Sequence, residues 1–359
     1  MAEHSRITLK QIALEARCSI TIASKVLNHA RSSAMVSDSR RRQVLEVARR
    51  LGYRANYHAQ ALKSGRSRAL GLLLDPPTPH EGAQVWLRKL VEGVELQTRD
   101  EGLGLLTLGP TQQHPIMARG LELALDGRVD ALIAPGAKYA LREFDLSALS
   151  IPMVLLWDDR WNTGLPYASL DETPGLRDLI RHARELGHRE AVWLSYADAR
   201  RLEIAPDRWA SLAGLAQQSG LRLFERRLHA PPEQGARDLA SSMEYIRQAA
   251  RAALPGLGAA TFVICYNDAL AMGLCSALQE RGRRVPQDIS VAGFDDLFAC
   301  FGQPPLTTVS LELVEVGRRA ARMALQRIPV PRGASKSLPS VERVPAKLVI
   351  RSSTGPVRP

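Results

Sequence analysis

Apolar and polar positions along the chain follow two different periods. From residue 69 onward, short apolar runs alternate with longer stretches in which apolar residues recur at helical spacing. The runs predict strands at 69–74, 103–108, 131–135, 153–157, 191–195, 261–266 and 289–294. The longer stretches predict helices at 86–101, 176–186, 269–282 and 311–328. Such alternation is typical of parallel sheets covered by helices, and two of these sheets joined by crossovers make a bilobed body.

The first 54 residues have another pattern, which predicts three short helices. Thr8 and Gln11 have the spacing of a capping box, with Thr8 as N-cap of a helix over 9–16. Ser19 can cap a second helix after a short turn. Its buried side has Ala23, Val26 and Leu27, and its outward side has Ile20, Thr21, Ser24, Lys25 and Asn28.

A third helix begins at Ser37 and Asp38 and ends at Gly52. Its predicted buried residues are Val44, Leu45, Ala48 and Leu51. Three short helices with a tight turn between the first two indicate a helix-turn-helix. A generic small helical bundle would show the same periodicity, so this pattern alone leaves both interpretations open.

Positive charge is concentrated in this helical head. Residues 1–68 contain fourteen Lys and Arg against four Asp and Glu, a net charge of +10. The whole chain has +11, so the residues from 69 onward are close to neutral. A small basic module on a near-neutral body is typical of a module that binds a polyanion. A merely solubilising surface would mix charges of both signs.

Composition excludes several other classes of protein. The 359 residues are 45% hydrophobic and 24% charged, as expected of a folded chain. No apolar stretch approaches the roughly 18 residues of a membrane span, and the N-terminus lacks the apolar core of a signal peptide. The 4 cysteines and 8 histidines are scattered without disulfide or metal-ligand spacing. We therefore expect a cytoplasmic protein with reduced thiols, without membrane association, metal ion or cofactor.

The head also resembles a known family. Ile7 to Asn28, ITLKQIALEARCSITIASKVLN, is similar to the N-terminal signature of the lactose-repressor/galactose-repressor (LacI/GalR) family, and residues 36–71 match its third helix and hinge. The resemblance implies that the second helix lies in the major groove of DNA, with Ile20, Thr21 and Lys25 nearest the base edges. Its DNA-contacting residues in the head are then Thr8, Ser19, Ile20, Thr21, Ser24, Lys25 and Asn28.

Two departures from the family pattern matter in the head. Arg17 stands where the family has a turn glycine, so we expect either strain at Arg17 or a shifted turn. Lys25 replaces the usual arginine. Because lysine lacks the planar fork that grips guanine, base readout at this position is expected to be softer.

Residues 56–63, NYHAQALK, correspond by the same resemblance to a hinge helix. Two such helices in a dimer would pack in the minor groove, with Asn56 and Ala59 at the DNA and Leu62 wedged into the central base step. An isolated helix of this length is marginal in water, so we expect it to form only on DNA. A plain linker is the alternative, since a Gly- and Ser-containing segment follows.

In the body, six segments match family landmarks in the family's order: 129–135, 185–195, 266–273, 285–296, 304–309 and 344–354. The resemblance therefore covers residues 7–354 and implies a small all-α head plus an α/β, bilobed, periplasmic-binding-protein-like body of two parallel-sheet subdomains. We expect three domains: 1–54 as the helix-turn-helix, 55–68 as hinge helix and linker, and 69–359 for effector binding and dimerisation. Lobe 1 is expected at about 69–160 plus 310–328, and lobe 2 at about 161–309 plus 329–359.

The residues that match the family's effector site are Arg208, Asn267 and Asp295, with Trp86 and Asp158 as weaker candidates. A guanidinium, an amide and a carboxylate together suit the hydroxyls of a sugar or a related metabolite. Each has a plainer interpretation. Arg208 could form an ion pair, Asn267 could cap the following helix, Asp295 could pin its loop, and Trp86 could belong to the core.

Two further departures, Trp157 at a usual aspartate and Leu311 at a usual polar position, predict a less polar pocket than a sugar site. The resemblance implies a homodimeric repressor whose affinity for double-stranded, pseudo-palindromic operator DNA is controlled by a small-molecule effector. We expect a dimer because no heptad helix follows the last strand. The alternative is a DNA-binding regulator with no small-molecule effector, or with a protein co-regulator.

Two other classes fit the residues less well. An extracellular solute-binding protein would have a signal peptide and no basic head. An enzyme would need a dinucleotide fingerprint, a nucleophile elbow or a metal-binding histidine pair, and the sequence contains none of them. We therefore expect no enzymatic activity.

Overall fold

The protein is described by a computed structural model over residues 7–27, 36–53, 65–74, 81–108, 126–135, 150–156, 164–196, 208–228, 239–329 and 338–358. The chain divides into two units, Met1–Arg68 and Ala69–Pro359. This division falls at the residue where the sequence pattern changes from the basic head to the α/β body. Each unit has a buried hydrophobic core of its own.

The first unit contains the three predicted helices, α1 (Leu9–Glu15), α2 (Ile20–Leu27) and α3 (Asp38–Arg50). The capping box at Thr8 and Gln11 is present in both directions. The buried core of the unit consists of Ile12, Ala13, Ala16, Ala23, Val26, Val44, Val47 and Ala48. The prediction that Leu45 is buried was wrong, since it is 42% exposed. Val47 occupies the core instead, because positions three and four after Val44 share its helix face.

Arg17 lies in the turn between α1 and α2, with a left-handed φ of 45°. The turn is therefore retained at the cost of strain rather than shifted. Two hydrogen bonds hold it: the Cys18 N–H donates to the Ala13 carbonyl (2.9 Å), and the Arg40 guanidinium donates to the Arg17 carbonyl (3.1 Å). Arg40 thus supports the conformation that a glycine would adopt without strain.

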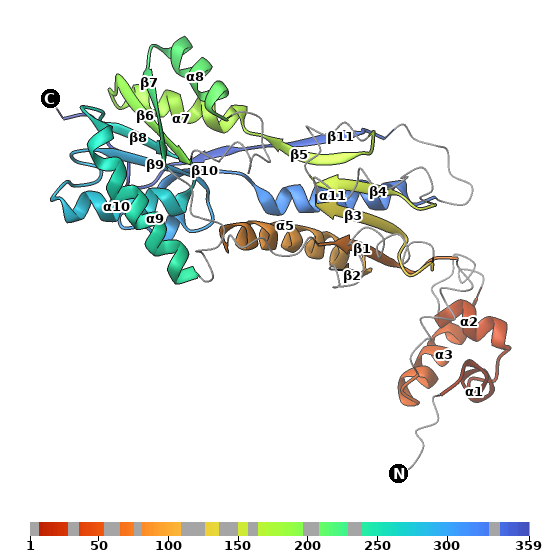
Figure 1. Cartoon of the computed structure of the whole chain (residues 1–359). Helices are drawn as coiled ribbons and strands as arrows, with labels where there is room; N and C mark the ends of the chain where they lie inside the picture. Colours follow the sequence, from red (N-terminus) through yellow and green to blue (C-terminus); the bar gives the residue numbers. More distant parts are fainter. Residues whose placement is uncertain are drawn as a thin grey trace. The chain divides into compact units, whose positions relative to one another are not determined.

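The second unit contains two sheets of six strands each (Figure 1). The first has the order β11-β5-β4-β3-β1-β2, with all pairs parallel. Its strands are β1 (Ala69–Leu73), β2 (Gly104–Leu108), β3 (Ala131–Pro135), β4 (Met153–Leu156), β5 (Tyr167–Asp171) and β11 (Val341–Pro345). The sequence pattern predicted four of these six strands, and it missed β5 and β11.

The second sheet has the order β12-β10-β9-β8-β6-β7, parallel except for the antiparallel pair of β10 with β12. Its strands are β6 (Glu190–Tyr196), β7 (Arg222–Leu228), β8 (Phe262–Cys265), β9 (Ser290–Asp295), β10 (Thr307–Ser310) and β12 (Lys347–Val349). β7 was not predicted because it lies at an edge of the sheet, where its RLFERRL sequence is mostly exposed or half-buried.

Helices cover the sheets. α5 (Glu81–Asp100) and α11 (Leu313–Arg327) pack on each other and on the first sheet. Their backbones approach closely at Gly93 and Gly317, where a side chain on either glycine would overlap the facing helix backbone. On the second sheet, α7 (Thr173–Glu185) packs on α8 (Arg208–Ser219), and α9 (Leu239–Ala253) packs on α10 (Asp268–Glu280). Short 3₁₀ turns lie at Leu254–Leu257 and Ala299–Phe301.

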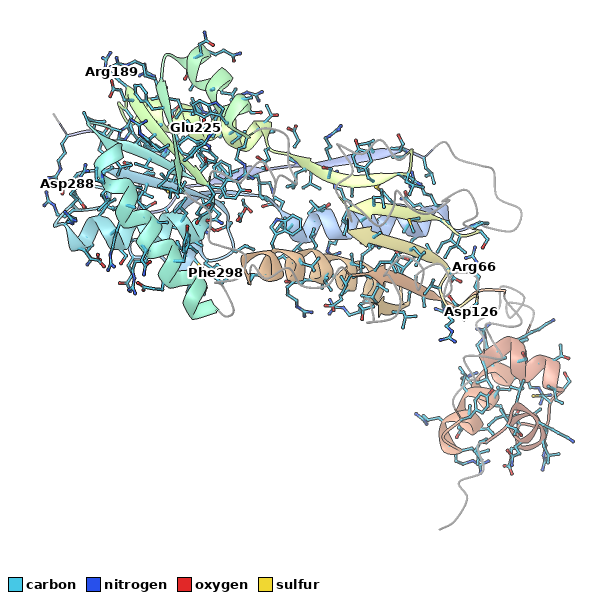
Figure 2. The ribbon with its side chains drawn as sticks, in the orientation of Figure 1. Arg66, Asp126, Arg189, Glu225, Asp288 and Phe298 are labelled. Carbon is cyan, nitrogen blue, oxygen red and sulfur yellow. The ribbon has the colours of Figure 1, made fainter. Side chains whose placement is uncertain are left out.

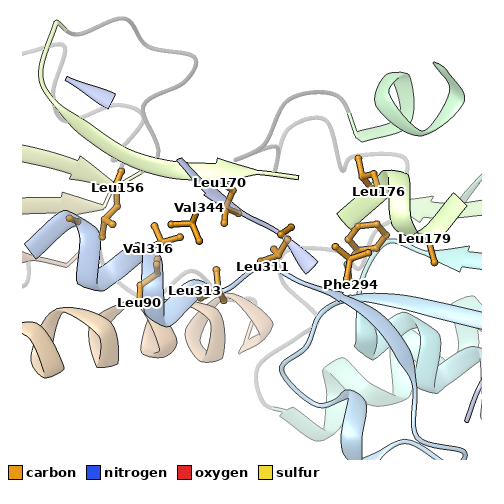
Figure 3. Close-up of a cluster of buried hydrophobic side chains, with 14 of the residues drawn as sticks. Leu90, Leu156, Leu170, Leu176, Leu179, Phe294, Leu311, Leu313, Val316 and Val344 are labelled. Atoms are coloured by element: carbon orange, nitrogen blue, oxygen red, sulfur yellow. The ribbon is translucent and has the colours of Figure 1, made fainter. Parts of the chain in front are cut away.

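The chain crosses between the sheets three times: from β5 to α7, from β10 to α11, and from β11 to β12. The expected lobe limits were therefore wrong in two places, because residues 167–171 and 341–345 belong to the first sheet. The single core cluster that contains Leu170, Leu311 and Val344 also contains Phe294 and Leu176 of the second lobe. In Figure 3, Leu311 lies between the residues of the two lobes.

Candidate functional sites

The outward face of α2 presents the residues assigned to base contact. Ile20 is 50% exposed, Thr21 is exposed, and Ser24 and Lys25 are half-buried. The opposite face packs Ala23 and Val26 into the core of the head, so the helix cannot turn these residues inward.

Serine and threonine residues cap both helices of the motif. The Ser19 hydroxyl accepts a hydrogen bond from the Ile22 N–H (3.2 Å), and Thr8 accepts from the Gln11 N–H (3.3 Å). The Thr8 hydroxyl also donates to the Gln11 side-chain oxygen (3.0 Å), whereas the Ser19 hydroxyl can still donate to a phosphate oxygen. Both residues lie at helix N-termini, where anions are favoured. The assignment of Thr8, Ser19 and the α2 residues to DNA stays a prediction.

The other DNA-contact predictions fall on Asn28, Asn56, Ala59 and Leu62, which lie outside the described residues. Among the basic side chains of the head, Arg50 is paired with Glu15 (2.6 Å), and Arg42 donates to the Asp38 carbonyl (3.4 Å). The bond from Arg42 to a carbonyl leaves its charge in place, and the pair of Arg50 with Glu15 neutralises one positive charge. The unit therefore keeps a large excess of positive charge.

In the body, Arg208 is the first residue of α8, and its guanidinium donates hydrogen bonds to Glu172 and to Tyr266. Its Nε and Nη2 donate to the two carboxylate oxygens of Glu172, both at 2.7 Å, and its Nη1 donates to the Tyr266 carbonyl (3.0 Å). The guanidinium carbon lies 4.4 Å from the Phe294 ring centroid and 5.3 Å from that of Tyr266. The Arg208 side chain is 12% exposed and that of Glu172 is 7% exposed. The ion-pair interpretation of Arg208 therefore holds, but the pair is buried rather than at the surface.

Burial acts to lower the pKa of Arg208, yet the charge of Glu172 and its hydrogen bonds outweigh burial and raise that pKa above its ordinary value. Three of the five N–H groups of the guanidinium have described partners. The remaining two can meet a ligand.

Asp295, at the end of β9, differs from Arg208 in its hydrogen bonding. Its carboxylate has no hydrogen-bond partner among the described residues, and its backbone has a left-handed φ of 94°. Burial raises the pKa of Asp295 to about 7, although the nearby charge of Arg208 acts to lower it. A half-buried carboxyl group on a strained backbone, without a partner among the described residues, is of the kind that concentrates at binding sites.

Asn267 and Asp268 have different roles at the start of α10. The Asn267 side-chain oxygen accepts from the Leu270 N–H (2.9 Å), so Asn267 is the N-cap, and its amide NH₂ is left for a ligand. Asp268 holds the loop after β9: it accepts from the Leu297 N–H (3.0 Å) and the Thr308 hydroxyl (2.6 Å), and also from the N–H of Phe298. The pinning role that was an alternative for Asp295 thus belongs to Asp268.

The three main candidates lie at one edge of the second sheet. Asp295 pairs in register with Ser310 of the neighbouring strand, and Asn267 follows the parallel strand β8 on the other side. Arg208 reaches the same edge through its bond to the Tyr266 carbonyl and its contact with Phe294. Carboxyl ends of parallel strands are where α/β proteins bind ligands.

The structure gives less information on the two weaker effector-site candidates, Trp86 and Asp158. Trp86 is half-buried and packs against the main core cluster, and Asp158 lies outside the described residues. Leu311, expected to face the pocket, is buried in the core. Sequence reasoning missed Glu172, Tyr266 and Phe294, because only the fold brings Glu172 to a residue that follows it by 36 positions.

The shifted pKa of Asp295 predicts a pH effect on stability. Between about pH 4 and 7 the folded state keeps the Asp295 proton while the unfolded chain, with a pKa near 3.8, has lost it, so stability falls as the pH rises. Asp295→Asn removes this cost. We expect the variant to be more stable than the wild type at pH 8 by on the order of 1–3 kcal/mol, and equally stable at pH 4. Urea titrations at both pH values measure this difference.

Asp288→Asn is the matched control (Asp288 is labelled in Figure 2). Its pKa is lowered to about 2 by hydrogen bonds from Arg284, so its removal cannot stabilise the protein at pH 8. Asp268, whose pKa burial raises to about 6, leaves a smaller slope of the same sign in every variant. Equal pH slopes in the wild type and Asp295→Asn would show that Asp295 is not shielded as described.

Two further properties of the described residues concern metal ions and membranes. These residues contain no group of three or more His, Cys, Asp or Glu side chains that could bind a metal ion. None of the helices described here has the length and hydropathy needed to cross a membrane.

Comparison with known proteins places these sites in context. Residues 180–354 match the family described as a periplasmic binding protein-like domain. The chain is 28% identical over 353 residues to the HTH-type transcriptional repressor PurR of Haemophilus influenzae, covering 96% of this chain and 98% of the relative. It is also 28% identical to the HTH-type transcriptional regulator GalS of Salmonella typhimurium, over 89% of each chain.

Solved structures agree with this assignment at the level of the fold. The lac repressor dimer bound to operator and the anti-inducer ONPF has a TM-score of 0.70 at 22% identity, covering 98% of this chain and 100% of that one. The complex of the transcriptional regulator CelR with cellobiose has a TM-score of 0.59 at 21% identity, covering 97% and 100%. With a basic three-helix head, a two-sheet body and similarity to repressors along nearly its whole length, the chain is similar throughout to the LacI/GalR family of transcriptional regulators.

Proposed function

We propose that the protein is a homodimeric repressor that binds a double-stranded, pseudo-palindromic operator through its head and responds to a small-molecule effector in its body. The outward residues of α2 read base edges, and the +10 charge of residues 1–68 binds the phosphate backbone. The effector lies at the carboxyl edge of the second sheet and contacts Arg208, Asn267 and Asp295. The chain acts by binding and does no chemistry on its ligand.

One observation carries the effector part of this proposal. Asp295 holds a shielded carboxyl group on a strained backbone, with no hydrogen-bond partner among the described residues, beside a guanidinium that keeps two N–H groups for a further partner. The Asp295 side chain is half-buried, and a carboxylate shielded from water without a protein partner costs stability. A bound ligand would satisfy it.

The hydrogen-bonding groups at this edge favour a ligand with several hydroxyl or amide groups. Arg208 and the Asn267 amide donate, while Asp295 accepts when ionised and donates when protonated. The half-buried ring of Tyr266 beside Arg208 adds an aromatic surface of the kind that covers a sugar ring or a base. The related structures with cellobiose and with ribose carry ligands of this chemistry.

A melting-temperature screen of the full-length protein against sugars, nucleobases and nucleosides tests the effector. A true effector at 100 times its Kd stabilises the protein by about 2.7 kcal/mol. The same compound should give little stabilisation of Asp295→Asn, whereas Asp288→Asn should respond like the wild type. A compound that stabilises all three proteins equally binds elsewhere. A screen without any stabilising compound would favour a regulator without a small-molecule effector.

Lys25→Ala is expected to change which bases the protein prefers. Lys25 lies on the outward face of α2, where a single ammonium group contacts one base acceptor at a time. Selection from a random duplex library at fixed salt measures the preferred motif of the variant and of the wild type. We expect lower information content at one position of each half-site and an affinity loss of about 1–3 kcal/mol.

Arg49→Ala is the control, because its exposed side chain lies near the end of α3 and away from the outward face of α2. It should weaken binding to all sequences alike without altering the motif. If Lys25→Ala selects an unchanged motif, Lys25 contacts only a phosphate.

A further inference from the structure

The three crossovers between the sheets are cross-linked into one structure. The Ala346 N–H, between β11 and β12, donates to the carbonyl of Asp171 at the end of β5 (2.8 Å). Lys347 forms an ion pair with Glu312 of the crossover from β10 (2.9 Å), and Glu312 also accepts from the Ser310 hydroxyl (3.1 Å). A displacement at one crossover therefore reaches the other two.

The segments that form the crossovers are tightly packed, so they have little room to move independently. Gly175, in the first turn of α7, lies against Val309 and Ala346, and a side chain at this position would meet Val309 at 2.6 Å. Glu312 adopts a left-handed φ of 51°. Close-packed segments respond to a local shift by moving together rather than by deforming one at a time.

Glu172 connects this structure to the candidate effector site. It lies in the first crossover, directly after β5 and before α7, and its carbonyl accepts from the Leu176 N–H in the first turn of α7 (3.0 Å). Its side chain is the bidentate partner of Arg208. The crossover and the site thus share Glu172: its backbone belongs to the crossover from β5 to α7, and its carboxylate belongs to the candidate effector site.

We propose that Glu172 is the positioning residue that couples the effector site to the crossovers between the lobes, through its ion pair with Arg208. The proposal rests on the function given above and adds the route by which occupancy is transmitted. A ligand that bonds to Arg208 and Asp295 changes the balance of charge around the guanidinium. Glu172 is bonded to that guanidinium, and because its backbone lies in the first crossover, a movement of Glu172 shifts the crossovers.

Glu172→Gln tests this route in the full-length protein without any ligand. The chain provides a control of the same geometry: Arg251 and Glu280 form a bidentate pair with the same two 2.7 Å bonds, but they connect α9 to α10. This pair is 44% and 41% exposed, so Glu280→Gln is expected to cost less stability than loss of the buried pair, and the test depends on where exchange rises rather than on how much stability is lost. Glu172→Asp, which keeps the charge but shortens the side chain, replaces Glu172→Gln if that variant does not fold.

Amide hydrogen exchange is the first measurement. In Glu172→Gln we expect exchange at Ala346 and in the first turns of α7 and α11 to rise at least about tenfold relative to the sheet cores, while Glu280→Gln raises exchange only in α9 and α10. A uniform rise over the whole body would indicate general destabilisation and overturn the proposal. Unchanged exchange at the crossovers would also overturn it.

Operator affinity is the second measurement, on a duplex selected by the wild-type protein. A residue that only stabilises the body cannot alter DNA affinity once the protein is folded, whereas a coupling residue should change the operator Kd by about fivefold or more. Glu280→Gln should stay within about twofold. An unchanged Kd in Glu172→Gln contradicts the coupling even if an effector binds at Asp295. Loss of ligand binding with intact coupling contradicts the effector site instead.

Discussion

A truncated chain of residues 69–359 is expected to lose specific operator binding, with an affinity at least about 10⁴ times below that of the full-length protein. The physical reason is electrostatic, since residues 1–68 carry +10 of the total charge of +11. Without them there is no excess of cations to displace counterions from the phosphate backbone, and no α2 to read bases. Fluorescence anisotropy with the selected duplex at several salt concentrations measures this loss.

The same truncation should leave the body folded. The buried clusters of the body contain no residue of the head, and the chain divides at Arg68 and Ala69. We expect the melting temperature of the truncated chain to match the body transition of the intact protein. Residual binding should be non-specific and weak. Specific binding of the selected duplex by the truncated chain would disprove the assignment of the head to DNA.

Arg208→Ala is expected to have the second large effect, on stability and on effector response together. The substitution leaves the buried Glu172 carboxylate without its bidentate partner, which typically costs about 3–5 kcal/mol. It also removes the donors through which the proposed effector is bound. Because both effects are expected, this single variant cannot separate a structural from a sensing role of Arg208.

The double variant Arg208→Ala/Glu172→Ala separates them. Removing both charges eliminates the unpaired carboxylate, so much of the lost stability should return and the two substitutions should be strongly non-additive. The response of operator affinity to the compound found in the screen should stay lost. Urea titrations give the stabilities, and operator titrations with and without that compound give the response. A stable double variant with a normal response would make Arg208 purely structural.

Some features of the site follow from local sequence, and they were predicted well. The capping box at Thr8 and Gln11, the cap at Ser19 and the end of α3 at Gly52 depend on neighbours within four positions. The seven predicted strands were all found: six are buried, and buried parallel strands are continuous apolar runs, while β2 at the edge of its sheet is half-exposed but also apolar. The amphipathic helices α5, α7 and α11 were also found from their periodicity.

The missed elements lack such a local signal. β11 and β12 are short and half-exposed, and they form strands because their partners, β5 and β10, supply the hydrogen bonds. The lobe limits were wrong for the same reason, since assignment of a segment to a sheet depends on pairing across more than 150 residues. Leu45 was taken as buried because it is apolar, although the packing of α3 against α1 and α2 places Val47 in the core.

The sequence by itself determined that a basic three-helix module precedes an α/β body, because charge segregation and hydrophobic period are local properties that need no folded partner. It also determined which residue types match an effector site. Only the tertiary structure decided their roles. The fold brings Glu172 to Arg208, moves loop pinning from Asp295 to Asp268, and gives Asp295 a left-handed backbone without a hydrogen-bond partner in the described part of the chain. Burial and pairing are properties of neighbours in space, and these neighbours lie tens of residues apart along the chain.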